Sequence, residues 1–192
     1  LRPIIVTTKS TSMPSYCKIA PGHPFHGPYH DKEYGFPVRD DTALFERLVL
    51  EINQAGLSWL TVLKKRESFF KAFHGFNIER IARYQSRDRT RLLANTAIIR
   101  NRLKINSVIE NAKRLQKIQH RHGSFQSWLD LNHPRNLEDW IVLFKRTFCF
   151  TGQEITREFL VSTGYLEGAH TLTCPVYKEV LKTQPAWTRT KE

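Results

Sequence analysis

The sequence of 192 residues is long enough for one globular domain with an apolar core and too short for two comfortable ones. Hydrophobic residues make up 40% of it, which excludes a disordered chain. No apolar run reaches the roughly 18 residues of a membrane span, and this predicts a cytoplasmic protein with no membrane partner. Thirty Lys and Arg against 18 Asp and Glu give a net charge of +12, which favours a polyanionic partner.

The first residues differ from the rest of the chain. Residues 1–12 lack an initial methionine, and Met13 is the only methionine in the sequence. We therefore expect residues 1–12 to be a tag or disordered leader, the alternative being a native extension of a processed chain. A single domain is expected over 13–185, with residues 186–192 as a tail.

Residues 14–38 are rich in Pro, Gly, His and Tyr, and this composition predicts an ordered but irregular segment. Helical periodicity begins at Asp40 or Asp41, either of which is a suitable N-cap, and the expected helix buries Leu44, Leu48 and Ile52. Gly56 is expected to end this helix.

The remaining pattern is helical throughout. Ser58, Asn77 and Ser86 are expected to cap further helices, and a long helix is expected from Asn101 to about Gln119. Its apolar stripe should contain Ile105, Val108, Ile109, Ala112 and Leu115, and its basic outer face Arg102, Lys104, Lys113, Arg114 and Lys117. Two short helices over 124–131 and 136–146 and one from Gly152 to Gly164 complete the series. No alternating strand pattern is present, so the predicted fold class is all-α.

Two cysteines and two histidines lie near the two ends of the expected domain: Cys17, His30, His170 and Cys174. Two thiolates and two imidazoles are the ligand set of a closed zinc site, whose role would be structural because no position is left for water. The alternative is a buried free cysteine at each end with solvated histidines. Cys149 is expected in the core.

Glu51 shares the apolar face of its helix, where a carboxylate is costly without partners or a cationic ligand. Trp59 follows on the next helix, and the N-terminal segment supplies Tyr29 and Tyr34. A buried carboxylate beside aromatic rings suits a flat, positively charged ring. Alternatively, Glu51 accepts hydrogen bonds from backbone donors of the adjacent loop, and Trp59 is a core residue.

Several motifs together resemble the 3-methyladenine DNA glycosylase I family, in order from Cys17 to about Cys174. They are YHDKEYGFP (29–37), LEINQAGLSWLTVLKKRE (50–67), AIIRNRLKI (97–105), FTG (150–152) and the His170–Cys174 pair. The resemblance implies an all-α fold of the helix-hairpin-helix superfamily, with a phosphate-binding hairpin around FCFTG. It also implies one structural zinc held by Cys17, His30, His170 and Cys174.

The implied activity is monofunctional excision of 3-methyladenine from double-stranded DNA, without a lyase step, by a monomer. Glu51 would be the catalytic residue and contact the flipped base, and Tyr29 and Trp59 would stack on it. Leu57, together with Gly56, would fill the gap left in the duplex.

The sequence departs from the family pattern at the outer wall of the implied pocket. Ile19 and Tyr34 stand where tryptophan is common, and His26 where tyrosine is common. Two rival functions remain. A nucleic-acid-binding module with a structural zinc explains the charge but not Glu51, and a zinc hydrolase requires one of the four ligands to be wrong.

Overall fold

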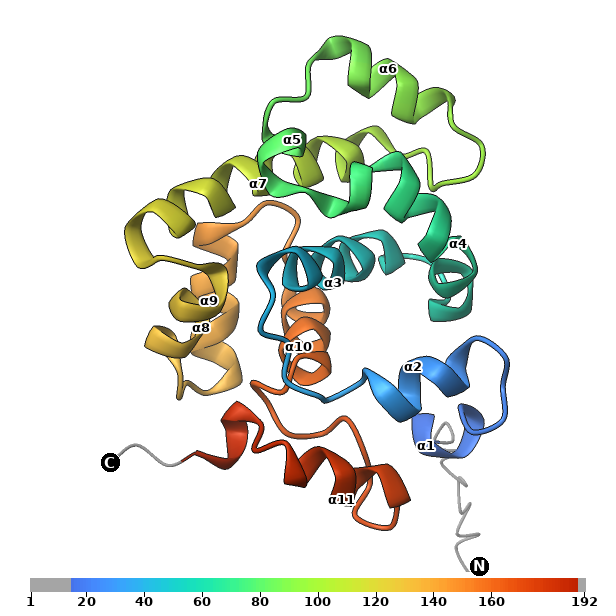
Figure 1. Ribbon diagram of the computed structural model, residues 1–192, viewed down its shortest axis with the longest axis vertical. Coiled ribbons are helices and arrows are strands. Elements are labelled where there is room, and N and C mark those ends of the chain that lie inside the picture. Colours follow the sequence, from blue (N-terminus) through green and yellow to red (C-terminus); the bar gives the residue numbers. More distant parts are fainter. Residues whose placement is uncertain (1–14, 190–192) are drawn as a thin grey trace, which may run out of the picture.

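The computed structural model describes residues 15–189, and all regular structure in that range is helical (Figure 1). The expected leader over residues 1–12 lies outside the described residues. The elements in chain order are α1 (Tyr16–Ile19), α2 (His26–Lys32), α3 (Asp41–Gln54), α4 (Trp59–Ala72), η1 (His74–Phe76), α5 (Ile78–Ala82), α6 (Ser86–Ala94), α7 (Arg102–His122), α8 (Phe125–Asn132), α9 (Leu137–Thr147), α10 (Gln153–Ser162), α11 (Pro175–Lys182) and η2 (Ala186–Thr188). The all-α prediction is confirmed. None of the described helices has the length and apolar character needed to span a bilayer.

Helix α3 is the centre of the fold, and it packs against α4, α7, α8 and α10. Figure 1 shows α4 to α7 on one side of α3, with α1, α2 and α11 on the other. A single apolar cluster joins helices α3 to α10, and its largest fully buried side chains include Phe45, Phe69, Phe125, Trp140 and Phe159. Packing from several directions therefore fixes the central helix, which makes it a rigid support for functional side chains.

Local hydrogen bonds explain where most helices begin. The side chains of Asp40, Ser58 and Asn77 accept hydrogen bonds from the backbone N–H groups of the first turns that follow them, as predicted. Asn101 caps α7 in the same way. The cap predicted at Ser86 is wrong by one residue, because Gln85 is the N-cap and its backbone N–H donates to the Asp88 carboxylate at 3.0 Å.

The N-terminal segment is more regular than predicted, since it contains α1 and α2. Pro28 is the third residue of α2, where a backbone N–H has no intrahelical partner, so the proline costs the helix no hydrogen bond. Near the other end of the chain, α11 and η2 were not predicted. Pro175 is the first residue of α11, and Ala186 of η2 is buried.

The predicted stripe of α7 is buried as expected, but Lys104 does not belong to the basic outer face. It is 5% exposed, and its ammonium donates to the carbonyls of Asn53 at 2.9 Å and Ala55 at 2.6 Å. Two carbonyl groups at the end of α3 are thus satisfied by a lysine from another helix.

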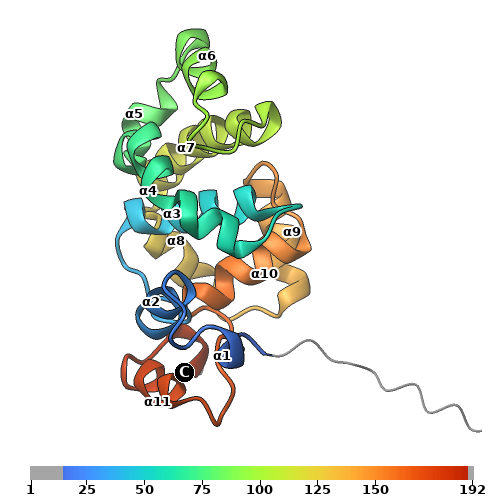
Figure 2. The same cartoon turned by 90° about the vertical axis from the view of Figure 1, so that its right-hand side faces the viewer.

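Helices α9 and α10 pack against each other, and the turn at residues 148–152 connects them. Asn111 of α7 fixes this turn, because its side chain accepts from the N–H of Cys149 at 2.7 Å and donates to the carbonyl of the same residue at 3.0 Å. Cys149, expected in the core, is only half-buried. Figure 2 shows the turn at 148–152 and the connection between α3 and α4 projecting on the same side of the molecule.

Candidate active site and metal centre

The four predicted metal ligands converge at one place. Cys17 lies on α1, His30 on α2, His170 in the loop before α11, and Cys174 at the N-cap of α11. One ligand atom from each side chain lies within 4.8 Å of the other three. Three of the four side chains are buried and Cys17 is half-buried, so the cluster is largely shielded from water.

The spacing of these atoms fits tetrahedral coordination. Nδ1 of His170 lies 3.2 Å from Nε2 of His30, and the sulfur of Cys174 lies 3.7 Å from each of these nitrogens. Bonds of ordinary length from a central zinc would place two nitrogens about 3.3 Å apart and a nitrogen and a sulfur about 3.6 Å apart. The group can therefore hold a metal ion.

Hydrogen bonds on the outer side orient both imidazoles. Nδ1 of His30 lies 2.7 Å from a carboxylate oxygen of Asp31, and Nε2 of His170 lies 2.7 Å from the backbone oxygen of Tyr34. A ring nitrogen that donates outward leaves the other nitrogen with its lone pair directed to the cluster. Gly35 allows this close approach, because at its φ of +86° a Cβ would lie 2.6 Å from the Cβ of Ala169.

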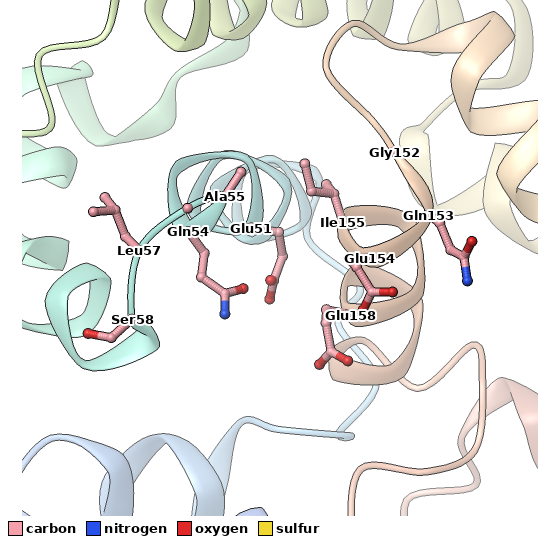
Figure 3. A pocket seen from close by; sticks show the side chains of 11 residues that line it. Glu51, Gln54, Ala55, Leu57, Ser58, Gly152, Gln153, Glu154, Ile155 and Glu158 are labelled. Atoms are coloured by element: carbon pink, nitrogen blue, oxygen red, sulfur yellow. The ribbon is translucent and has the colours of Figure 1, made fainter.

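A second feature is an open cavity of about 940 Å³ between the end of α3, the turn that follows it, and the first half of α10. Figure 3 shows the side chains of Glu51 and Gln54 from α3 and of Glu158 from α10 extending their polar ends into the same space. The remaining lining residues are Ala55, Gly56, Leu57, Ser58, Gly152, Gln153, Glu154 and Ile155.

Glu51 is 3% exposed, and no described residue donates a hydrogen bond to its carboxylate. The alternative in which it accepts from backbone donors therefore has no support among residues 15–189. Burial, and after it the negative charge of Glu158, raise the pKa of Glu51 to about 8, although Arg47 opposes both effects. A carboxyl group held in this way without partners would gain from a cationic ligand.

Aromatic rings stand behind this carboxyl group. The rings of Tyr29 and Trp59 lie 5.1 Å apart in an edge-to-face arrangement, and Tyr34 lies 5.7 Å from Tyr29. The Tyr29 hydroxyl is buried without a hydrogen-bond partner among the described residues. Burial also raises the pKa of Tyr29, with Glu51 among the charges that act on it, so the ring and the carboxyl group share one environment.

Three residues near this site were not predicted. Tyr16 contacts the rings of Tyr34 and His26, and its hydroxyl lies 3.0 Å from Nδ1 of His26. Ile19 is exposed, so the aromatic wall at this end comes from Tyr16 instead. Arg47 lies 4.7 Å above the Tyr29 ring, and Glu158 accepts a hydrogen bond from the Tyr34 hydroxyl at 3.1 Å. Of these three residues, only Tyr16 could have been found from the sequence, because it directly precedes the predicted metal ligand Cys17.

The turn after α3 presents an apolar tip. Gly56 has a φ of +77°, which favours glycine, and Leu57 is 42% exposed at the cavity edge. Across the cavity, Gly152 is the N-cap of α10 and has no side chain to cap it, so among the described residues no side chain accepts from the first N–H groups of this helix. The apolar tip at Leu57 and the start of α10 thus line the same cavity.

Comparison with known proteins identifies relatives of this chain. A family model described as "Methyladenine glycosylase" matches residues 20–138. The DNA-3-methyladenine glycosylase of Haemophilus influenzae is 36% identical over 166 residues, which cover 77% of this chain and 89% of that protein. DNA-3-methyladenine glycosylase 1 of Escherichia coli is 35% identical over 173 residues, which cover 80% of this chain and 92% of that protein.

The fold agrees with these matches. The crystal structure of a 3-methyladenine DNA glycosylase I is similar with a TM-score of 0.75 and 34% identity, over 84% of this chain and 98% of that one. The family predicted from the motifs is confirmed: the chain belongs to the methyladenine glycosylase family, the 3-methyladenine DNA glycosylases I.

Proposed function

We propose that this protein hydrolyses the bond between 3-methyladenine and its deoxyribose in double-stranded DNA, after the base has been flipped into the cavity beside Glu51. One observation carries the proposal. The buried carboxyl group of Glu51, which has no hydrogen-bond partner among residues 15–189, lies in an open cavity next to aromatic rings. The substrate follows the names of the relatives, which are 3-methyladenine glycosylases.

The chemistry of the lesion explains what this arrangement can do. Adenine methylated at N3 is positively charged within DNA, so its bond to the sugar is already weakened and the base leaves as a neutral molecule. Such a substrate needs little acid catalysis, and the enzyme has mainly to extrude it and recognise its charge and shape. Glu51 is the catalytic residue in this scheme, because its carboxylate pairs with the cationic base.

Tyr29 and Trp59 are proposed to hold the plane of the base. Tyr29 is buried beneath the site, and its hydroxyl has no hydrogen-bond partner among the described residues. Leu57, at the exposed tip of the turn that Gly56 makes possible, is proposed to enter the duplex and fill the space of the extruded base. The free N–H groups at the start of α10 suit a backbone phosphate.

The proposed reaction ends with hydrolysis. A lyase step requires an amine nucleophile, and no lysine is among the residues that line the cavity. The ammonium of Lys104, at the nearby end of α3, is already bound to two carbonyls. We also propose that the enzyme acts as a monomer, in the cytoplasm, where the DNA of a bacterial cell is found.

We further propose that the ion held by Cys17, His30, His170 and Cys174 is one zinc with a structural role. The donor set of two thiolates and two imidazoles, and its spacing, support this choice. When bound, the metal supplies a crosslink between the two ends of the domain. Recognition of the base is left to residues of the chain. Tyr29 directly precedes the ligand His30 on α2, so the helix that the metal would hold also positions the Tyr29 ring.

The test is release of free base by Glu51→Gln. Gln keeps the size of the side chain but has no negative charge to pair with the lesion. Single-turnover release of 3-methyladenine should therefore fall by about 10-fold to 100-fold, as expected for the loss of one charged hydrogen bond. Affinity for undamaged DNA should change little. Glu67→Gln on the exposed surface of α4 is the matched control.

Melting temperatures of both variants separate chemistry from folding. A destabilised Glu51→Gln that still releases base at the normal rate at low temperature would show that the carboxylate is structural. If the unchanged protein releases no base from methylated DNA, the chain is a binding module and the proposed reaction is wrong.

A further inference from the structure

A second carboxylate faces Glu51 across the cavity. Glu158 lies on α10, which packs against α3, and both side chains line the same space (Figure 3). The two groups are close enough that the charge of Glu158 is the second cause, after burial, of the raised pKa of Glu51. Two negative groups that share a cavity disfavour each other unless a cation lies between them.

The position of Glu158 is fixed by hydrogen bonds to both of its oxygens. Oε2 accepts from the Tyr34 hydroxyl at 3.1 Å, and Oε1 pairs with the guanidinium of Arg157. Its side chain is 27% exposed, so it lines the open part of the cavity, whereas Glu51 lies at the buried end. A carboxylate has about four lone-pair positions, and two donors leave room for a ligand to donate a further hydrogen bond.

Tyr34 holds Glu158 in place. Its phenol ring packs between Tyr29 and Tyr16, and its hydroxyl donates a hydrogen bond to Glu158. A phenylalanine at this position would keep the ring and lose the donor. The acidic side chain in the wall of the cavity is therefore positioned by an aromatic residue of the N-terminal segment.

We propose that Glu158 is a second acidic recognition residue of the base site, which together with Glu51 makes this site select a cationic N-methylated purine over a neutral base of the same shape. This inference rests on the proposed function. Glu51 recognises the charge at the buried end of the base, and Glu158 adds a negative potential on the open side. Tyr34 is the positioning residue that keeps the Glu158 carboxylate directed to the cavity.

The experiment compares two duplexes with the full-length, metal-bound protein. One carries 3-methyladenine, and the enzyme concentration that gives half of the maximal single-turnover rate is measured. The other carries 3-deaza-3-methyladenine, a neutral base of the same shape, and its dissociation constant is measured by fluorescence anisotropy. Glu158→Gln should raise the half-maximal enzyme concentration on the 3-methyladenine duplex about fivefold to tenfold, as expected for a partly exposed charge. It should leave the dissociation constant of the neutral duplex within twofold.

Glu154→Gln is the matched control, since Glu154 lies one turn earlier on α10 at the cavity rim and is exposed. It removes the same charge from the same helix, so it should change the half-maximal enzyme concentration on the 3-methyladenine duplex and the dissociation constant of the neutral duplex by the same factor. Tyr34→Phe should produce part of the Glu158→Gln effect, because the carboxylate remains but loses its internal donor. Melting temperatures confirm that each variant is folded.

The possible outcomes separate the two proposals. If the unchanged protein releases no 3-methyladenine, the proposed function fails and the role of Glu158 fails with it. If release is normal but Glu158→Gln weakens both duplexes equally, or behaves as Glu154→Gln does, only the role of Glu158 is overturned. A selective loss on the cationic duplex supports it.

Discussion

Glu51 is expected to make the stability of the protein depend on pH. Its pKa is about 8 in the folded protein, against 4.5 for an unperturbed glutamate. Between these values the folded protein keeps a proton that the unfolded chain releases, so this group lowers the free energy of unfolding as the pH rises from about 4.5 through 8. The buried carboxyl group of Glu51 thus opposes folding in alkaline solution.

Thermal unfolding of the unchanged protein and of Glu51→Gln, from pH 5 to pH 8.5, tests this expectation. The two should melt within about 1 °C of each other at pH 5, where the folded proteins both have a neutral side chain. At pH 8.5 the variant should melt at least about 3 °C higher, the shift for roughly 1 kcal/mol in a domain of this size. Parallel curves across the whole range would contradict it.

The sequence predicted the residues whose signal is local. Glu51 was found because a carboxylate breaks the apolar face of its own helix, and Trp59 because it follows the next cap. Glu158 and Arg47 were missed, since each becomes part of the site only through tertiary packing. Glu158 reaches the cavity because α10 lies across α3, and no pattern within α10 distinguishes it from a surface residue.

At the scale of single elements, Lys104 is expected to hold the end of α3 in place. Its two hydrogen bonds to the carbonyls of Asn53 and Ala55 fix the chain just before the turn that carries Leu57. Lys104→Met should lower stability by about 1–3 kcal/mol, because buried carbonyl groups lose their donor. The excision rate should fall further than the loss of folded protein explains, since the tip loses its support.

Lys113→Met is the control, because Lys113 lies on the exposed face of the same helix. Melting temperature and single-turnover release at a temperature where all variants are folded separate the two effects. Normal release by a folded Lys104→Met would show that the lysine stabilises α3 without positioning the turn.

The helices that the sequence did and did not predict differ in their source of stability. The long apolar stripe of α7 and the caps of α3 and α4 are local signals, and they were read correctly. Helices α1 and α2 are too short to be stable alone, and α2 contains Gly27 and Pro28, so the composition of this segment indicated irregular structure. Cys17 and His30 tie them to the C-terminal loop, an effect that no local pattern contains.

At the scale of the whole molecule, the metal ligands are expected to contribute to folding. Cys174→Ser should reduce the bound zinc, from about one ion per chain, and lower the melting temperature by about 10 °C, because metal-binding free energy is folding free energy. Excision should fall with it, since Tyr29 and Tyr34 lie on the segment that the ligands hold.

Cys149→Ser is the control, since this cysteine lies outside the cluster. Elemental analysis of protein purified without chelator measures the metal directly. Full metal content and an unchanged melting temperature in Cys174→Ser would contradict the structural role, and a metal other than zinc would correct its identity.

The distance along the chain between the metal ligands has a consequence during protein synthesis. His30 and Cys174 are 144 positions apart, so a ribosome makes the second ligand on the order of ten seconds after the first. Until then the nascent chain has the aromatic residues of the proposed base site but not the C-terminal members of the cluster. A product truncated before Cys174 therefore cannot complete the cluster.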